Sequence, residues 1–466
     1  MVNLNACDKI LDIETRYPVE DIEYNGIKIW PFIRMYLFFF LFNKNVANKQ
    51  KKNTFLFKLF CIIRSIRILP LKDLLKKGSI ILFTYSSGGQ LRLIDGTFID
   101  AYFNDIINLE ERILPIVYED KPAYQSVFSK YININFIYVI IYIIFLIVKI
   151  KKNKIKKLDV LININNELNL NLNIYKKIAE IYTSIIVYKT LFKFLKPSRI
   201  YQICYYNINS MAASYAAKEL NILVIEIQHG LIHLGHGAYI AKKNIYPNPY
   251  PKYFFCFGEI YKEIVSSSVY EKKNIIPIGS FYIDLMKKRK KENFEAFNKK
   301  YGKYENKILV TFAGQVGIEN EMLVMMKSIV SLCTNLICIY IPRYITDEVK
   351  NISSPNIIVE NKLDVYQCIQ NTQITSTIFS TVAVESLVFG TPVILLNINN
   401  LAKSCFSELL SSVKSVYYAD TPEEYVNNIS KAISMDREQV AIEGACFYAD
   451  NHREQVRKAI NEISKR

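Results

Sequence analysis

The chain has 466 residues, of which 51% are hydrophobic and 22% are charged. This length exceeds what one hydrophobic core supports, and this composition excludes an intrinsically disordered protein, so we expect at least two globular domains. Lysine and arginine number 59 against 43 aspartate and glutamate, a net charge of +16, and such an excess favours anionic partners such as nucleic acid, acidic lipid or a phosphorylated substrate.

The cysteines and the N-terminus favour a cytoplasmic protein. The nine cysteines stand singly without a CxxC pair, which is typical of a reducing compartment. The polar and acidic stretch 1–23 lacks the pattern of a secretory signal.

Residues 1–77 are predicted to form a helical, membrane-proximal region. The stretch 30–42 is apolar except for Arg34, and 55–69 mixes apolar residues with Lys and Arg. Basic amphipathic segments of this kind are typical of membrane-surface binding, and packing of the same helices in the protein core is the plainer alternative.

A second apolar and basic stretch lies in a helix-prone insert at about 120–157. Thirteen apolar residues, 136–148, are followed by six lysines between 149 and 157. Because a bilayer-spanning helix needs roughly 20 apolar residues, we expect attachment to the anionic inner face of the cytoplasmic membrane. An AT-rich genome, which enriches Lys, Ile and Asn, is the compositional alternative.

A first series of short apolar runs is predicted to form a Rossmann-like domain over 78–290. Its strands are expected at 79–85, 158–162, 199–205, 223–227, 253–257 and 275–278, and its helices at about 166–195 and 210–220. Strands that alternate with helices imply a parallel, doubly wound sheet, whose ligands bind at the carboxyl ends of the strands. The polar, lysine-rich and strand-free stretch 287–305 is predicted to link this domain to the next.

The second series predicts a Rossmann-like domain over 305–466. Strands are expected at 307–312, 336–341, 356–359, 373–378 and 391–396, with helices at 320–332, 364–370 and 381–389. The remainder is expected to be mostly helical and to pack back across the cleft between the domains.

The sharpest chemical pattern lies where the expected strand 373–378 runs into the next helix. Ser380 and Thr381 can cap that helix, and Glu385 follows one turn later. Free N–H groups and hydroxyls at a helix start can hold phosphate, and a carboxylate can accept hydrogen bonds from ribose hydroxyls. An ordinary N-cap with an acidic first turn is the structural alternative.

A second pattern follows the expected strand 223–227, where three of the four histidines are His229, His233 and His236. A neutral imidazole at a strand end can act as general base or hold a phosphate, and we predict this role for His229, with Gln228 and His236 as supporting polar groups. A zinc site is disfavoured because neither cysteine nor carboxylate joins the histidines at ligand spacing, so we expect no metal.

Both patterns resemble a known class of enzyme. The run Ser-Thr-Val-Ala-Val-Glu-Ser-Leu-Val-Phe-Gly-Thr-Pro-Val-Ile, 380–394, is similar to the donor-binding segment of GT-B glycosyltransferases. The similarity is greatest to bacterial capsular-polysaccharide and lipopolysaccharide transferases, including CMP-Kdo transferases and teichoic-acid-type polymer transferases. The turn 228–230 resembles one in the N-terminal domain of these families, and 25–34 resembles their N-terminal element.

The resemblance implies a GT-B fold, in which two Rossmann-like domains face a cleft. It implies that Ser380 and Thr381 contact the donor phosphate and that Glu385 contacts ribose. Further donor-side candidates are Gly279, Gly314, Gln315 and Arg343, and acceptor-side candidates are Arg92 and Asp95.

One position departs from the family pattern. The related transferases carry histidine before the proline that corresponds to Pro342, whereas this chain has Ile341 there. Arg343 can replace that histidine on phosphate, since guanidinium binds phosphate bidentately. Because of this departure, the sequence does not determine which nucleobase the donor carries.

We therefore expect a metal-independent glycosyltransferase of capsule or lipopolysaccharide biosynthesis. It would move a sugar from a nucleotide-sugar donor, its substrate rather than a cofactor, to a lipid-linked or growing polysaccharide acceptor. The alternatives are a CDP-polyol phosphotransferase of teichoic-acid type and a non-catalytic, membrane-bound assembly factor. Nucleic acid is not an expected partner, because the basic residues adjoin apolar segments rather than alternating with aromatic ones.

Overall fold

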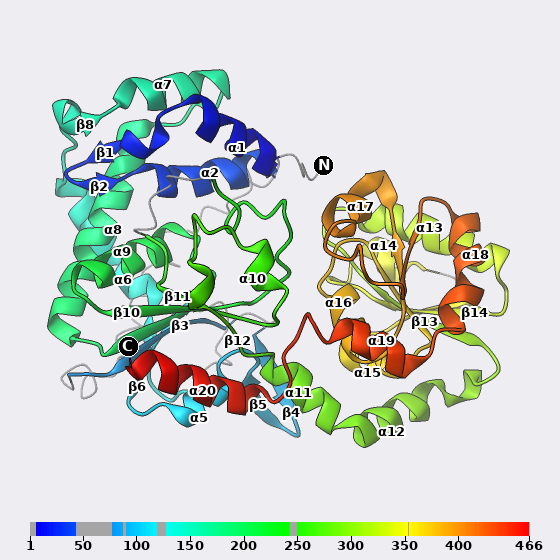
Figure 1. Cartoon of the computed structure of the whole chain (residues 1–466). Coiled ribbons are helices and arrows are strands. Elements are labelled where there is room, and N and C mark those ends of the chain that lie inside the picture. The colour runs from blue at the N-terminus through cyan, green and yellow to red at the C-terminus, as the bar shows by residue number, and fades with distance from the viewer. Residues whose placement is uncertain are drawn as a thin grey trace.

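The computed structural model describes residues 6–42, 77–86, 90–118, 127–242, 249–352 and 354–465. They form two α/β halves joined near the bottom of the view, with the N-terminal half on the left (Figure 1). The basic amphipathic stretch 55–69 lies outside the described residues, as do the lysine-rich stretch 44–52 and the Ser-Gly-Gly residues 87–89 that follow the first strand.

The N-terminal half is built on a parallel sheet of seven strands in the order β12-β11-β10-β9-β3-β6-β7. The chain enters the sheet at the interior strand β3, adds β6 and β7 on one side, and then returns to add β9 to β12 on the other, which makes the sheet doubly wound. The strands are β3 (Ile80–Tyr85), β6 (Ile113–Tyr118), β7 (Ile132–Asn133), β9 (Arg199–Ile203), β10 (Leu223–Ile227), β11 (Tyr253–Cys256) and β12 (Ile275–Pro277).

Helices cover this sheet, and a small antiparallel hairpin extends from it. The helices are α5 (Asn104–Leu109), α6 (Ile134–Ile147), α7 (Leu158–Glu167), α8 (Ile174–Leu195), α9 (Ile208–Glu219) and α10 (Tyr261–Ile264). The hairpin, which we did not expect from the sequence, consists of β4 (Leu91–Ile94) and β5 (Thr97–Asp100).

The C-terminal half repeats the plan with six parallel strands in the order β15-β14-β13-β16-β17-β18. The strands are β13 (Ile308–Ala313), β14 (Leu336–Ile341), β15 (Ile357–Val359), β16 (Ile374–Thr377), β17 (Val393–Leu396) and β18 (Val416–Ala419). The helices are α13 (Glu319–Leu332), α14 (Asp347–Lys350), α15 (Val365–Ile369), α16 (Val382–Val388), α17 (Leu401–Phe406), α18 (Pro422–Ile433) and α19 (Arg437–Gly444). The expected α/β fold with two Rossmann-like halves is confirmed.

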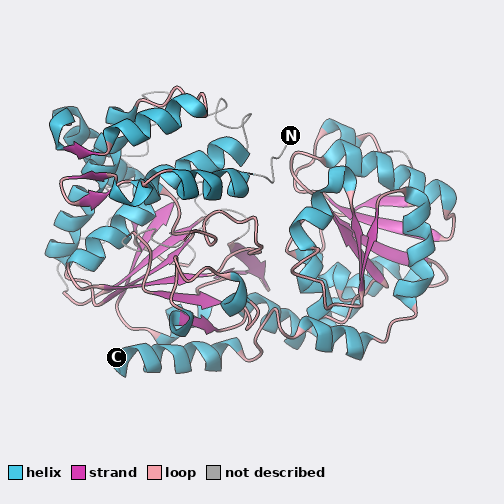
Figure 2. Cartoon of the chain, turned by 45° about the horizontal axis from the view of Figure 1, so that its top comes forward, coloured by secondary structure: helices cyan, strands magenta, loops and turns pink. Residues whose placement is uncertain are grey.

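Two connections join the halves (Figures 1 and 2). The first is helical: α11 (Phe281–Lys288) and α12 (Lys290–Tyr301) occupy the strand-free, lysine-rich stretch. The second is the return segment, residues 445–451, which leads from α19 back to α20 (His452–Lys465) on the N-terminal half. There the buried His452 ring lies 2.8 Å from the Asp105 carboxylate on α5, which anchors α20.

The expected strand at 158–162 is wrong, because this stretch begins α7. Val160, Leu161 and Ile164 are buried at helical spacing, and a short apolar run does not by itself distinguish a strand from a buried helix face. The following helix also starts later than expected: Asn173 caps α8 by accepting from Lys176 N at 3.0 Å.

For residues 30–42 the structure shows the plainer alternative, packing in the protein core. This stretch is α2 (Trp30–Phe42), which follows α1 (Ala6–Arg16) and the short strands β1 (Glu23–Tyr24) and β2 (Ile27–Lys28). Trp30 and Arg34 are both fully buried, and Arg34 forms an ion pair of 2.5 Å with Glu14. The described N-terminal stretch is therefore part of the core, and β1 pairs with β8 (Ile155–Lys156) at the end of the insert.

The apolar insert helix α6 is 14 residues long. Among the residues that the structure describes, no helix is long and apolar enough to cross a bilayer.

Candidate active site

The C-terminal half presents its polar groups where its sheet changes direction, between β13 and β16. Gly314 and Gln315 follow β13, and Ser380 and Thr381 follow β16, at neighbouring strand ends. Gly314 allows close packing there, since a Cβ would lie 3.0 Å from both Ile341 O and Pro342 Cα. In doubly wound sheets this switch point is where ligands bind.

Arg343 reaches the same place from the loop after β14. Its Nη2 lies 3.5 Å from Ser380 Oγ, and Ser380 itself is only 4% exposed. This pairing of a guanidinium with a hydroxyl offers several donors to an anionic ligand.

The start of α16 differs from the expected cap. Ser380, rather than Thr381, provides the cap, since Ser380 Oγ accepts from Val382 N at 3.4 Å and Ser380 O accepts from Ala383 N at 3.1 Å. Two N–H groups at this helix start, those of Val382 and Ala383, are thus already bonded within the turn.

Glu385 lies one turn along α16 and is 8% exposed. Burial raises the pKa of its carboxyl group, against the opposing effects of a hydrogen bond from Tyr366 and the charge of Arg92. Tyr448, from the return segment, donates to Glu385 Oε1 at 3.5 Å. The carboxyl group therefore sits among tyrosine hydroxyls at the base of the site.

The N-terminal half contributes His229 from the turn after β10. Its Nε2 lies 3.1 Å from Tyr206 Oη, and its carbonyl oxygen accepts from Tyr102 Oη at 2.9 Å. Nδ1 is buried and has no hydrogen-bond partner among the described residues. Burial lowers the pKa of His229 to about 4, so the imidazole is neutral at neutral pH.

Gln228 and His236 hold the loop rather than line the site. Gln228 is fully buried, donates to Gly230 O at 2.9 Å and accepts from Phe257 N at 2.8 Å. The His236 ring packs 4.9 Å from that of Tyr239, and its Nδ1 accepts from Ala238 N. Among the described residues, no three His, Cys, Asp or Glu side chains are grouped so as to hold a metal ion.

A cavity of about 430 Å³ is lined by residues of both halves. It contains seven of the residues singled out in the sequence, which are Arg92, His229, Gln315, Arg343, Ser380, Thr381 and Glu385. His233, Tyr102 and Tyr366 also line it, and a small adjoining pocket of about 40 Å³ reaches Tyr448. The four tyrosines around His229 and Glu385 (Tyr102, Tyr206, Tyr366 and Tyr448) were missed, because nothing marks them among 33 tyrosines in the sequence.

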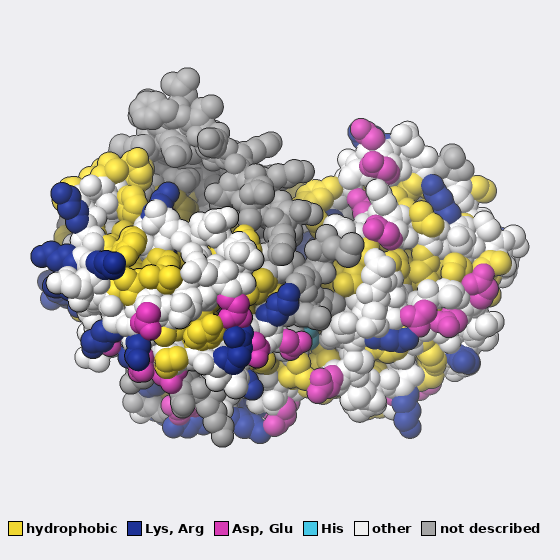
Figure 3. Space-filling model, turned by 90° about the horizontal axis from the view of Figure 1, so that it is seen from above, with side chains coloured by type: hydrophobic (Ala, Val, Ile, Leu, Met, Phe, Trp, Pro, Cys, Tyr) yellow, Lys and Arg dark blue, Asp and Glu magenta, His cyan; other side chains and the backbone are white. Residues whose placement is uncertain are grey.

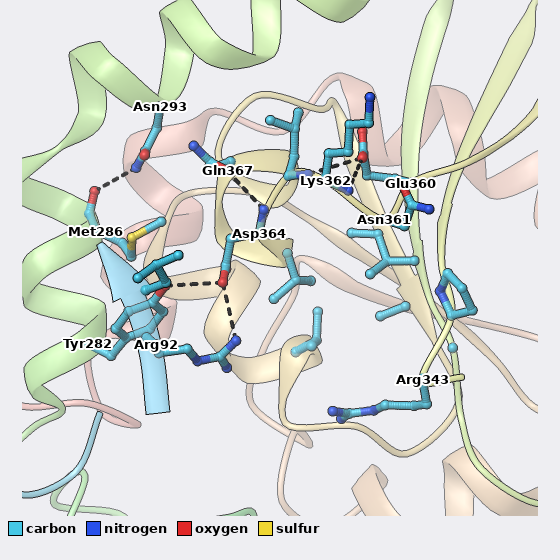
Figure 4. Close-up of a pocket in the computed structure, with 18 of the residues that line it drawn as sticks. Arg92, Tyr282, Met286, Asn293, Arg343, Glu360, Asn361, Lys362, Asp364 and Gln367 are labelled. Carbon is cyan, nitrogen blue, oxygen red and sulfur yellow. Dashed lines mark hydrogen bonds and ion pairs between the residues drawn. The ribbon is translucent and has the colours of Figure 1, made fainter. Parts of the chain in front are cut away.

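A larger cavity of about 1040 Å³ opens beside the first and shares Arg92 and Arg343 with it (Figure 4). Gly314 lies in its wall, together with the loop 341–345 after β14 and the loop 360–365 after β15. Glu360 shapes the second loop, since its Oε1 accepts from Lys362 N and Leu363 N at 2.7 and 3.0 Å.

Arg92 and Asp95, expected on the acceptor side, form ion pairs with other elements. Arg92 Nη1 lies 3.2 Å from Asp364 Oδ2 in the C-terminal half, and Tyr282 Oη donates to the same oxygen at 3.1 Å (Figure 4). The Asp95 carboxylate is paired with Arg289 at 2.6 Å. Arg92 therefore bridges the halves and lines both cavities, and Asp95 lines the larger cavity while it is paired with Arg289.

Gly279, expected on the donor side, lies beneath the return segment instead and lines neither described cavity. Its φ is +77°, and a Cβ would lie 2.0 Å from Ala449 O. The return segment also passes close to Gly258, where an added Cβ would lie 2.3 Å from Cys446 O. These glycines let the chain cross closely between the halves.

Comparison with known proteins bears on the fold. No protein-family model matches the sequence, and no curated protein matches it. Many solved structures match, and among them are two that cover 83% of this chain and align over 97% of their own chains. The first is MnaA of S. aureus, solved with UDP, with 13% identity and a TM-score of 0.51.

The second is a protein assigned as a UDP-N-acetylglucosamine 2-epimerase from Listeria monocytogenes, with 11% identity and a TM-score of 0.50. The chain has a GT-B-type fold. At this level of identity the likeness concerns the fold alone.

Proposed function

We propose that this protein is a glycosyltransferase that moves a sugar from a nucleotide-activated donor to a surface polysaccharide or its lipid-linked precursor. The observation that carries the proposal is the shared cavity. In it Arg343, Ser380 and Glu385 of one half meet a neutral His229 of the other.

The donor phosphates would bind at Arg343 and Ser380, which already lie 3.5 Å apart. The buried Gln315 Oε1 lacks a hydrogen-bond partner among the described residues and, as an acceptor, would take a hydrogen bond from a hydroxyl or N–H group of the donor. The larger cavity would take the nucleobase, since it adjoins Arg343 and is walled by Ile341, Ile345 and Leu363. Glu385 would accept from ribose hydroxyls deeper in the site.

The transfer step would use His229 as the base. With Nε2–H donating to Tyr206 Oη, the unpartnered Nδ1 carries the lone pair, which an acceptor hydroxyl would reach once this buried atom is exposed to the cavity. The acceptor oxygen attacks the anomeric carbon, and His229 takes its proton. The bond from the anomeric carbon to the phosphate oxygen breaks, and its electron pair stays on that oxygen. Arg343 and Ser380 stabilise the charge that develops there.

The first test is the thermal shift of the purified protein with CMP, CDP, UDP and GDP. Selective stabilisation by one nucleotide that is lost in Arg343→Ala supports the proposal, and no stabilisation by any of them contradicts it. Arg453→Ala, at an exposed site on α20, is the matched control and should respond like the wild type.

Product analysis then separates the candidate reactions. Release of UDP together with an elongated acceptor identifies a UDP-sugar transferase, whereas release of CMP points to a CMP-sugar or a CDP-polyol donor. A donor that is epimerised without transfer would overturn the proposal. Wild-type polymer in cells carrying His229→Ala or Glu385→Ala would instead favour a non-catalytic assembly factor.

A further inference from the structure

Helix α6 has an apolar face that the fold does not cover. Its inner side packs against α8, with Ile134 and Ile137 buried. On the opposite side Tyr142, Ile143, Leu146 and Ile147 are 53–74% exposed. Their spacing of one and four residues places them on one side of the helix, and we call these four side chains the α6 outer face.

Such a cluster is unusual for this protein. No other described helix exposes more than two large hydrophobic side chains. Contiguous exposed apolar surface on a soluble domain marks a place that another molecule covers.

The charge next to the α6 outer face indicates what that molecule is. Six lysines (Lys149, Lys151, Lys152, Lys154, Lys156 and Lys157) follow the helix directly, and all are exposed. In the view of Figure 3, Lys and Arg side chains gather at the left end of the molecule, over the N-terminal half. A second copy of this chain would bring like charges together, whereas an anionic lipid surface would attract them.

The position of α6 links this face to the candidate active site. The helix starts at Asn133, the last residue of β7, whose side chain caps it by accepting from Asn135 N at 2.9 Å. All strands of this sheet are parallel, so α6 begins at the same edge that carries His229 after β10.

We infer that the protein docks on anionic membranes through α6, with its outer face among the lipid acyl chains and the following lysines at the headgroups. The 14-residue helix lies in the interface, because it is too short to span the bilayer. A membrane-linked acceptor would then be presented to the sheet edge that carries His229.

The test is co-sedimentation of the full chain with vesicles. Equal parts of phosphatidylglycerol and phosphatidylcholine form the anionic vesicles, and phosphatidylcholine alone forms the neutral ones. We expect binding to the anionic vesicles, weaker binding to the neutral ones, and loss of the difference at high salt. The wild type remaining in solution with both vesicles would overturn the inference.

Two variants assign the binding to this surface. Leu146→Gln/Ile147→Gln should lower the partition coefficient about tenfold, since less apolar area enters the bilayer. Lys151→Gln/Lys152→Gln should lower it about fivefold per lysine on anionic vesicles and little on neutral ones. The control Val324→Gln/Leu332→Gln removes equally exposed side chains from α13 and should bind like the wild type.

Unchanged binding of the Leu146/Ile147 variant would sink the inference. A change in its oligomeric state on size exclusion, without a change in vesicle binding, would show that a second copy covers the face instead. Nucleotide thermal shifts on the same samples report folding and the donor site. Vesicle binding without any nucleotide response would therefore contradict the proposed function alone.

Discussion

At the scale of single residues, burial and a few hydrogen bonds determine the charge and the orientation of the side chains in the candidate site. Arg343 presents its guanidinium beside the Ser380 hydroxyl, and His229 is neutral because it is desolvated. Neither property can be read from the residue type, because an exposed histidine would titrate near its ordinary pKa. The surrounding protein determines both.

Arg343 should dominate donor affinity. Arg343→Ala is expected to weaken nucleotide binding by about 10- to 100-fold, as the loss of charge-assisted hydrogen bonds implies. Arg343→Lys should recover only part of it, because an ammonium lacks the planar pair of donors. Isothermal titration with the nucleotide that stabilises the protein measures this. Equal affinities of Arg343→Ala and wild type would remove Arg343 from the site.

Tyr206 should act as a positioning residue for His229. Tyr206→Phe keeps the ring but removes the hydroxyl 3.1 Å from Nε2, which frees the imidazole to change its tautomer. We expect kcat to fall about tenfold or more while KM for the donor changes little. Tyr175→Phe, at a 40% exposed site on α8, is the control. A fall in donor affinity alone would contradict this role.

At the scale of elements, the loop after β10 contains three partly buried histidines. Burial lowers the pKa values of His229 and His233 to about 4 and that of His236 to about 3. N-terminal helix α2 supports this loop, since Arg34 donates to the carbonyls of Gly237 and Ile240. The loop is therefore held in a form that disfavours protonation.

This loop should make the protein sensitive to acid. A histidine whose folded pKa lies below its unfolded value of about 6.5 binds fewer protons when folded, so stability is full above pH 6.5 and falls as the pH drops toward about 4. His236→Asn, which keeps an acceptor for Ala238 N, should recover on the order of 1 kcal/mol at pH 5. Urea unfolding at pH 7 and pH 5 measures this, and an unchanged pH slope in the variant would contradict it.

At the scale of the whole molecule, two sets of contacts hold the two halves of the chain together. The ion pair from Arg92 to Asp364 closes one side of the cavities, and the return segment crosses the other. Ala449 N donates to Phe257 O at 2.7 Å, and Tyr448 stacks on Phe257. Because Tyr448 also reaches Glu385, the crossing is coupled to the site.

The crossing should depend on Gly279. Gly279→Ala places a methyl group against Ala449 O at a positive φ, and we expect a loss of about 2–4 kcal/mol in unfolding free energy. Gly26→Ala has a similar φ of +83° but no neighbouring atom within 4 Å, and should lose only about 1 kcal/mol. Chemical denaturation of both variants compares them, and equal losses would show that the crossing tolerates the methyl group.

The sequence by itself determined the two βα series, most of their strands, and the polar residues at the strand ends. Short apolar runs between Gly-rich turns carry this information locally, so Ser380, Glu385 and His229 were identifiable without coordinates. The local sequence pattern did not determine the structure where burial depends on residues far apart in the sequence. Residues 158–162 are helical, and residues 30–42 lie in the core with Arg34 paired to Glu14.

Only the tertiary structure decided which candidates meet. In the structure Arg92, Arg343 and His229 line one cavity. Asp95 forms an ion pair with Arg289, and Gly279 lies beneath the return segment. The tyrosines around His229 and Glu385 come from separate stretches of the chain and have no local signature. Contacts between residues far apart in sequence arise from how the halves pack, and hydrophobic periodicity does not determine that packing.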